Sequence, residues 1–78
     1  MMNVSVLFFG QITDITHCSH TVLTDIADTD QLDERLHAAY PMLKQIKYVV
    51  TVDRKIIREN VVLLDNTEVA LLPPFSGG

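Results

Sequence analysis

The sequence predicts an α+β domain in which one main helix packs across one face of a mixed sheet of about five strands. Three observations lead to this prediction. The chain has 78 residues, which suits one compact core and a single domain over residues 1–78. Short β-branched and aromatic runs lie towards both ends, and the one clear helical pattern lies between them. The predicted order is strand, strand, helix, strand, strand, strand.

The first two strands are expected to form a hairpin. Residues 3–9 alternate between two apolar sets, with the period of two that is typical of a strand. Gly10 ends this strand, and the polar segment 11–20 is expected to be a turn. Residues 21–26 are rich in β-branched side chains, so we expect them to return antiparallel to the first strand.

The helix is expected to begin after Asp28 or Thr29, because either residue can cap it. Asp30 and Asp33 favour the positive end of the helix dipole. At the other end, Pro41 should end or kink the regular helix near Tyr40. The residues spaced to form one buried stripe are Leu32, Leu36, Ala39, Tyr40 and Leu43.

Three further strands are expected after the helix. Residues 48–52 (YVVTV) and 55–57 (KII) are predicted to be joined by a turn, and residues 68–72 (EVALL) form the last strand. Residues 61–64 (VVLL) are interpreted either as a short strand or as a buried connection. Before the last strand, Asn66 is a residue type that tolerates tight turns.

Alternation along the strands predicts two apolar faces if the first and last strands are neighbours at the centre of the sheet. The set facing the helix is Val4, Val6, Phe8, Val69 and Leu71. The set facing away is Leu7, Phe9, Ala70 and Leu72, with Ile56 or Ile57 from the fourth strand. Monomeric proteins seldom leave such a cluster open, so we interpret the second set as a protein-docking surface. Scattered surface hydrophobic residues are the alternative.

Composition and charge restrict the partners and the compartment. The formal net charge of −4 argues against nucleic acid as the main partner. The six basic residues fall in the middle third of the chain, which indicates two solvated faces or, alternatively, a basic patch for an anionic partner. Neither a membrane span nor a signal peptide is expected. Cys18 is the single cysteine, so a reducing, cytoplasmic setting without an internal disulfide is predicted.

Two patterns suggest chemistry, and each has a simpler interpretation. His17, Cys18 and His20 in HCSH have the side chains of zinc ligands, but a structural zinc site needs four ligands in two separated pairs. A polar loop is therefore favoured, and Cys18 has no evident base to make it a nucleophile. Asp30 paired with Asp33 or Glu34 is best explained by helix capping. We predict no metal site and no catalytic site belonging to this chain alone.

The C-terminal sequence LLPPFSGG is the most distinctive segment. Pro73 and Pro74 cannot donate to a sheet, so the last strand must stop at Leu72. Residues 73–78 are then expected to form a flexible, extended tail. The final glycines allow the backbone to thread a narrow channel, so that another protein can close around the carboxylate of Gly78. A frayed terminus without function is the alternative.

These residues resemble a known family. The LFFG end of the first strand, the EVALLPPFSGG ending and the strand order are similar to those of molybdopterin synthase small subunits, which are ubiquitin-like β-grasp sulfur carriers. The resemblance covers the whole chain, and the double proline before serine and diglycine is specific to that family. Sulfur carriers for thiamine or tRNA thiolation share the fold and the diglycine but typically lack the double proline.

The resemblance implies a carrier that serves molybdenum cofactor biosynthesis. An adenylating enzyme of the ubiquitin-activating type uses ATP and magnesium to convert the terminal carboxylate to an acyl-adenylate. Sulfur from a persulfide donor then replaces AMP, which gives a thiocarboxylate. The large synthase subunit accepts the tail, and sulfur passes there to cyclic pyranopterin monophosphate, in an assembly that is usually a heterotetramer. The chain itself is expected to bind no cofactor.

The resemblance also assigns roles to particular residues. Gly78 is the reacting residue and Gly77 is its flexible neighbour. The threading tail consists of Pro73, Pro74, Phe75 and Ser76. The docking patch falls on Phe9, Ile56 and Leu72.

The chain departs from the family pattern at a few positions. Asp53 stands where asparagine is common, and Asn66 with Thr67 replaces a glycine-aspartate pair. Asn66 is expected to take the left-handed conformation of that glycine. Phe75 replaces a smaller β-branched residue, and the THCSH loop lacks a glycine. Two alternatives stay open: a carrier that supplies sulfur for thiamine or tRNA, and a ubiquitin-like modifier or interaction module.

Overall fold

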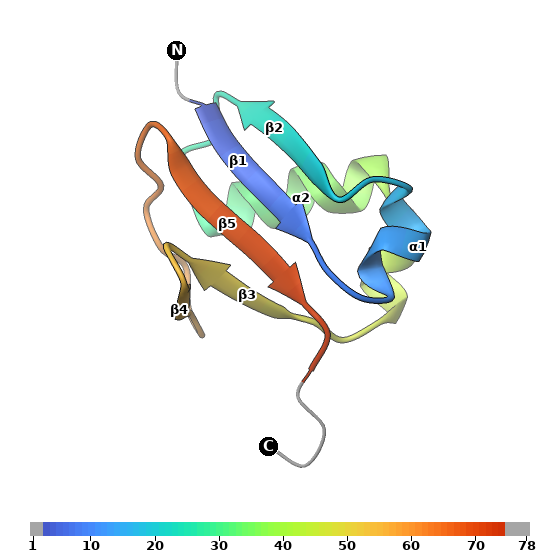
Figure 1. Ribbon diagram of the computed structural model, residues 1–78. Helices are drawn as coiled ribbons and strands as arrows, with labels where there is room; N and C mark the ends of the chain where they lie inside the picture. The colour runs from blue at the N-terminus through green and yellow to red at the C-terminus, as the bar shows by residue number, and fades with distance from the viewer. Residues whose placement is uncertain (1–2, 75–78) are drawn as a thin grey trace.

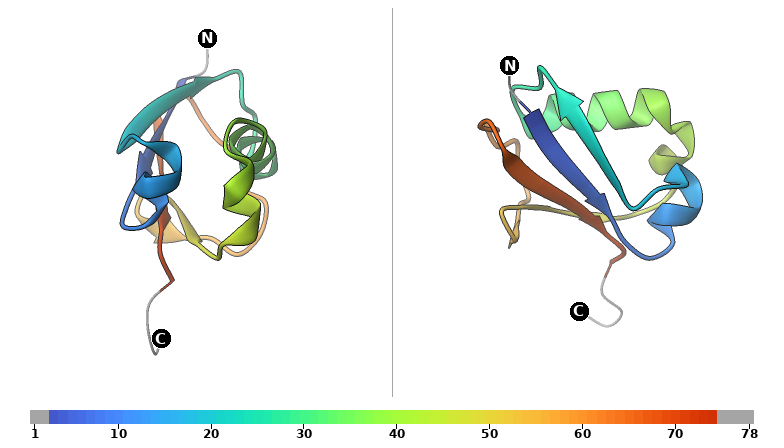
Figure 2. Two further views of the ribbon diagram at one scale, coloured as in Figure 1. Left: turned by 90° about the vertical axis from the view of Figure 1, so that its right-hand side faces the viewer. Right: turned by 45° about the horizontal axis from the view of Figure 1, so that its top comes forward.

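The computed structural model describes residues 3–74. In order along the chain the elements are β1 (Asn3–Phe8), α1 (Ile12–Thr16), β2 (His20–Thr24), α2 (Thr29–Ala39), the 3-10 helix η1 (Pro41–Gln45), β3 (Val49–Val52), β4 (Lys55–Ile56) and β5 (Thr67–Leu72). The strands form one sheet in the order β2-β1-β5-β3-β4. Helix α2 lies across one face of this sheet, and the other face is open (Figures 1 and 2). The α+β prediction with one main helix is confirmed.

The first and last strands are neighbours at the centre of the sheet, as predicted. β1 and β5 run parallel, with Val6 opposite Val69 and Phe8 opposite Leu71. β2 pairs antiparallel with β1, and β3 pairs antiparallel with both β5 and β4. Because only the central pair is parallel, the ends of β1 and β5 reach the same edge of the sheet, where the tail begins (Figure 1).

The core lies between the sheet and α2. The inward set predicted from alternation is entirely buried: Val4, Val6, Phe8, Val69 and Leu71. From the helical stripe, Leu32, Leu36 and Leu43 are also buried. Ala39 is exposed, so its predicted place in the stripe is wrong; it is the last residue of α2, next to the C-cap Tyr40. Tyr40 is half-buried and contacts Phe8 edge-on, with ring centroids 6.2 Å apart.

Reciprocal hydrogen bonds define the start of α2. The Asp28 carboxylate accepts a hydrogen bond of 2.9 Å from the backbone N–H of Gln31. The Gln31 side chain in turn accepts one of 2.9 Å from the N–H of Ala27. Of the two caps predicted, Asp28 is therefore the N-cap. Pro41 ends the regular helix as expected, and it stands at the start of η1.

Part of the segment 11–20 is helical, so the prediction of a turn over its whole length is wrong. α1 buries Ile12 and Thr16 against the core. The Thr13 hydroxyl donates to the Gly10 carbonyl at 2.8 Å, and His17 ends the helix with a left-handed φ of 60°. A five-residue helix has little stability alone, so burial of Ile12, which the local sequence does not reveal, explains why it forms.

The segment 61–64 is a connection and not a strand. Leu63 is buried, whereas Val62 and Leu64 are exposed. Apart from one isolated bridge between Val62 and Asp28, the segment has no strand partner in the part of the chain described. Its buried leucine fits the second interpretation of VVLL, in which the segment closes the core beside α2.

Two turns use left-handed backbone without glycine. Asp53 and Arg54 have φ of 49° and 70° and connect β3 to β4 as a two-residue hairpin loop. Asn66 has φ of 64°, which confirms the conformation predicted for it. The Asp65 carboxylate accepts a 2.8 Å hydrogen bond from the N–H of Asn3, so this turn is tied to the start of β1.

Candidate functional site

The open face of the sheet carries the predicted apolar cluster. Strand register aligns Leu7, Ala70, Thr51 and Ile56 across four strands. Val49 is opposite Leu72 in the next row, towards the tail. The side chains of Phe9 and Ile56 are 45% and 51% exposed. We call this set of residues the outer patch.

The structure corrects and extends the predicted patch. Ile56 shares a row with Thr51 on the open face, which decides between Ile56 and Ile57. Ala70 belongs to the same row but is buried, because β5 has neighbours on both sides and the side chain is small. Val49 and Thr51 were not predicted. Alternation within residues 48–52 indicates that Val49 and Thr51 face the same side of the sheet. Which side they face depends on the pairing of β3 with β5.

The tail begins beside the outer patch. The N–H of Phe9 donates to the carbonyl of Leu71 at 3.2 Å, which ties the end of the first strand to the last residues of β5. β5 ends at Leu72 as predicted. Pro73 is half-buried and Pro74 is exposed. Phe75, Ser76 and the two terminal glycines lie outside the described residues.

Gly10 supports the base of the tail. Its φ is +59°, and a Cβ atom added there would lie 2.5 Å from Cγ of Pro73. The close approach leaves no room for a side chain, and the left-handed backbone is unfavourable for β-branched residues. The local sequence indicates only that Gly10 ends a strand, because the contact joins residues that lie far apart in the chain.

We expect Gly10→Val to lower the free energy of unfolding by about 2 kcal/mol and to displace Pro73, because strain and overlap combine. Chemical denaturation measures the first effect, and NMR shifts of Leu72 and Pro73 measure the second. Gln11→Ala, an exposed change at the next position, is the control and should leave both unchanged. Unchanged Pro73 shifts in Gly10→Val would contradict this role of Gly10.

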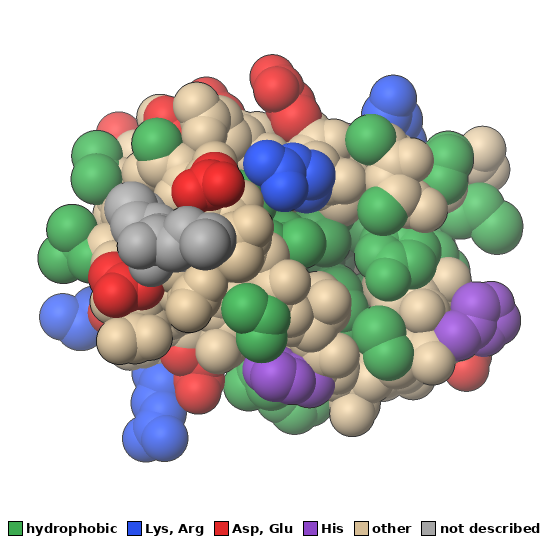
Figure 3. All heavy atoms as spheres, turned by 90° about the horizontal axis from the view of Figure 1, so that it is seen from above, with side chains coloured by type: hydrophobic (Ala, Val, Ile, Leu, Met, Phe, Trp, Pro, Cys, Tyr) green, Lys and Arg blue, Asp and Glu red, His purple; other side chains and the backbone are tan. Residues whose placement is uncertain are grey.

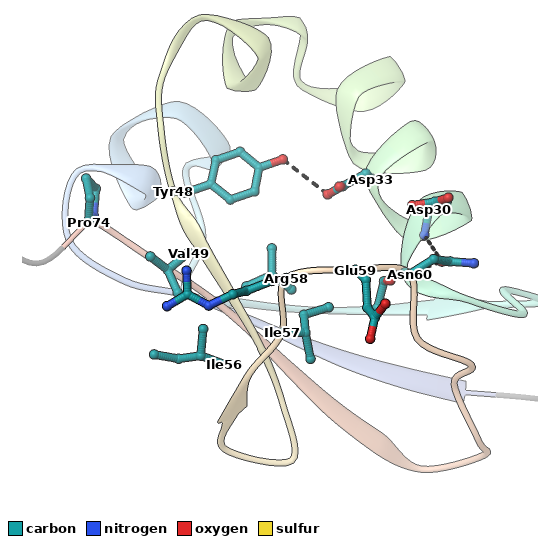
Figure 4. Close-up of a pocket in the computed structure, with 12 residues that line it drawn as sticks. Asp30, Asp33, Tyr48, Val49, Ile56, Ile57, Arg58, Glu59, Asn60 and Pro74 are labelled. Atoms are coloured by element: carbon teal, nitrogen blue, oxygen red, sulfur yellow. Dashed lines mark hydrogen bonds between the residues drawn. The ribbon is translucent and has the colours of Figure 1, made fainter.

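A second feature lies between α2 and the sheet, next to Pro74. The Tyr48 hydroxyl donates to the Asp33 carboxylate at 3.2 Å and lies 2.7 Å from Nε2 of His37 (Figure 4). Burial raises the pKa of Asp33 and outweighs the Tyr48 hydrogen bond and the His37 charge, which lower it. Burial, followed by the nearby Asp33 charge, raises the pKa of Tyr48, so its hydroxyl stays protonated at neutral pH. These contacts tie α2 to the chain entering β3.

The histidine-rich loop does not assemble a ligand set in the described part of the chain. Within residues 3–74 no group of three or more His, Cys, Asp or Glu side chains could hold a metal ion. His17 ends α1, and Cys18 packs against the core. The three residues instead have separate structural places, because His20 begins β2.

Charges are mixed on the face of the molecule that Figure 3 shows. Viewed from above, acidic, basic and hydrophobic side chains alternate over the described residues (Figure 3). This face therefore fits the interpretation of a solvated face and carries no basic patch among the described residues seen there. Among the described residues, no helix is long and apolar enough to cross a membrane.

Comparison with known proteins places the fold and the tail in one family. Residues 6–78, which include both the outer patch and the diglycine, match the ThiS family. The chain belongs to the ThiS family. This membership makes it a ubiquitin-like protein of the sulfur-carrier type, as the resemblance implied.

Solved structures with the same fold come from two functional groups. In a complex of subunits 1 and 2 of molybdopterin-converting factor from Helicobacter pylori, the matching chain is 25% identical, with 99% of this chain and all of that chain covered and a TM-score of 0.76. A Pyrococcus furiosus protein assigned as molybdopterin converting factor subunit 1 is 15% identical, with 96% and 100% covered and a TM-score of 0.88. Small archaeal modifier protein 1 from Methanosarcina acetivorans is 21% identical, with 100% and 98% covered and a TM-score of 0.84. The β-grasp fold of this ThiS-family chain is thus shared by subunits of molybdopterin-converting factor and by a small archaeal modifier protein.

Proposed function

We propose that this ThiS-family chain is the small subunit of molybdopterin synthase and carries sulfur for molybdenum cofactor biosynthesis. The observation that carries the proposal is the outer patch, which adjoins the base of a tail ending in diglycine. A related chain from Helicobacter pylori was solved in complex with subunit 2 of its converting factor. An exposed apolar surface beside the tail suits a partner that also encloses the tail.

The proposed chemistry takes place at the C-terminus. A carboxylate is a poor electrophile, so an activating enzyme uses ATP and magnesium to form the Gly78 acyl-adenylate and releases pyrophosphate. The terminal sulfur of a persulfide donor then displaces AMP and forms an acyl disulfide. A thiol cleaves the S–S bond of this acyl disulfide, which releases the thiocarboxylate and leaves the donor as a disulfide. The large subunit holds the tail and cyclic pyranopterin monophosphate, and its positive groups stabilise the oxyanion that forms during transfer. This chain contributes the sulfur and the docking surface.

Mass spectrometry tests the carrier chemistry directly. The protein is incubated with the activating enzyme, ATP and a sulfur donor, and we expect a mass increase equal to the replacement of one oxygen by sulfur. Fragmentation should place the change on Gly78. Omitting ATP is the control, because no acyl-adenylate then forms. An unchanged mass in the complete reaction would falsify the proposal.

Phe9→Ala tests the docking surface. We expect the affinity for the large subunit to fall by about 2 kcal/mol, or roughly thirtyfold, because Phe9 is the exposed aromatic residue of the patch. Isothermal titration calorimetry with the purified large subunit measures this change. Val62→Ala removes an exposed hydrophobic side chain from outside the patch and serves as the control. Equal affinities for Phe9→Ala and the unaltered protein would argue against docking through this face.

A protein modifier is the second candidate function. It is favoured by the shared fold of small archaeal modifier protein 1, at 21% identity. A modifier would form isopeptide bonds between Gly78 and lysines of other proteins, so diglycine remnants on those lysines would distinguish it from a thiocarboxylated carrier. A carrier for thiamine or tRNA would instead fail to restore molybdopterin in a strain that lacks the small subunit.

A further inference from the structure

A groove on the helix side of the sheet opens beside the base of the tail. It has a volume of about 610 Å³ and lies between the first half of α2, strand β3 and the segment 56–60. Pro74 stands at one end, and Asn60 and Asp30 stand at the other (Figure 4). A partner that encloses the tail must therefore pass one mouth of this groove.

The lining combines apolar surface with unequal charge. Val50 and Ile57 contribute apolar surface beside the Tyr48 ring, and Val49 and Ile56, which also belong to the outer patch, line the groove where it reaches the edge of the sheet. The acidic side chains are Asp30 and Asp33 from α2 and Glu59 from the opposite wall. Among the described residues that line the groove, Arg58 is the only cation, and its side chain extends towards Val49 (Figure 4). The acidic side chains thus lie towards the end away from Pro74, and apolar side chains lie between them and Pro74 (Figure 4).

Hydrogen bonds hold both walls of the groove in place. The Asn60 side chain accepts from the N–H of Asp30 at 2.9 Å and from the Thr29 hydroxyl at 3.1 Å. The N–H of Thr29 donates to the carbonyl of Val61 at 2.9 Å, and the N–H of Val61 donates to the Thr29 hydroxyl at 2.9 Å, which fixes the same wall. The Tyr48 hydroxyl bonds to Asp33 on the helix side. A site held in this way loses little conformational freedom when it binds.

We propose that this groove receives an arginine side chain from a protein partner that holds the tail. A guanidinium group stacks on an aromatic ring and donates to carboxylates in a fixed fork, which suits Tyr48 beside Asp33 and Asp30. The aliphatic part of the side chain would cover the apolar lining. A lysine side chain would fit less well because it lacks the planar fork of arginine. The negative charge of the groove disfavours nucleic acid as the occupant. The inference does not depend on which molecule finally receives the sulfur.

NMR titration with a small probe tests the proposal. The probe is acetyl-Leu-Arg-Leu-amide, and the matched probe is the same peptide with citrulline, which has the shape of arginine without its charge. We expect saturable shift changes at the amides of Asp30, Val49, Ile57 and Asn60 with the arginine probe. With the citrulline probe we expect an apparent dissociation constant about fivefold higher.

A pair of double variants separates the groove from general charge attraction. Asp30→Asn with Glu59→Gln removes two charges from the groove and should raise the dissociation constant for the arginine probe about fivefold. Asp14→Asn with Glu34→Gln removes two charges from exposed positions outside the groove lining. This second variant should leave the dissociation constant for the arginine probe unchanged. Equal weakening by both variants, equal binding of both probes, or shifts spread over the whole surface would each overturn the proposal.

Discussion

Phe8→Ala is expected to leave the protein largely unfolded near physiological temperature. The Phe8 side chain is 2% exposed, and its ring contacts Tyr40 edge-on in the core between the sheet and α2. Truncating a buried phenylalanine costs about 3–5 kcal/mol, which approaches the whole stability of many small domains. Circular dichroism during urea denaturation measures the loss, and Phe8→Leu should recover most of it because it refills part of the cavity.

The adjacent phenylalanine provides the sharpest control. Phe9 is 45% exposed on the open face, so Phe9→Ala should change the free energy of unfolding by no more than about 0.5 kcal/mol. The two substitutions are chemically identical and one residue apart, and they differ only in which face of β1 they affect. Similar losses of stability from both would contradict the assignment of the two faces.

Deletion of Gly78 is expected to abolish thiocarboxylate formation and molybdopterin synthesis completely. The deletion shortens the tail, so the new terminal carboxylate stops short of the position at which activation and transfer are proposed to occur. Mass spectrometry after incubation with the activating enzyme measures the first loss. An assay of molybdopterin formation with the large subunit measures the second.

The same deletion should not alter the fold or docking. Every buried hydrophobic residue of the described chain lies at or before Leu71, and β5 ends at Leu72. The free energy of unfolding should therefore stay within about 0.5 kcal/mol of that of the unaltered protein. Binding to the large subunit should persist through the outer patch. Ser76→Ala keeps the length and the carboxylate, so it should retain activity. Activity without Gly78, or unfolding caused by its loss, would refute the separation of tail and core.

Most secondary structure followed from local patterns. Alternation predicted β1 and β5 and divided their side chains correctly between core and open face. Asp28 and Pro41 marked the ends of α2 because caps and proline act through neighbouring backbone groups. The diglycine, with the double proline before it, supplied the functional hypothesis, and membership of the ThiS family supports its carrier class.

Other features depended on contacts between distant parts of the chain. Burial of Ile12 makes α1 helical, although its short sequence resembles a polar turn. The need for glycine at position 10 arises from Pro73, more than sixty residues later. The groove exists because Asn60 binds the start of α2 and Tyr48 binds Asp33.

The sequence by itself determined the order of the five strands and the main helix, the two faces of the central strands and the diglycine ending. These properties depend on side-chain alternation, backbone restriction and capping, which act over a few residues. The tertiary structure alone decided that Ile56, not Ile57, joins the outer patch, and that an acidic groove adjoins Pro74. Strand register and packing bring these residues together, and both depend on the free energy of the whole core, which no local pattern contains.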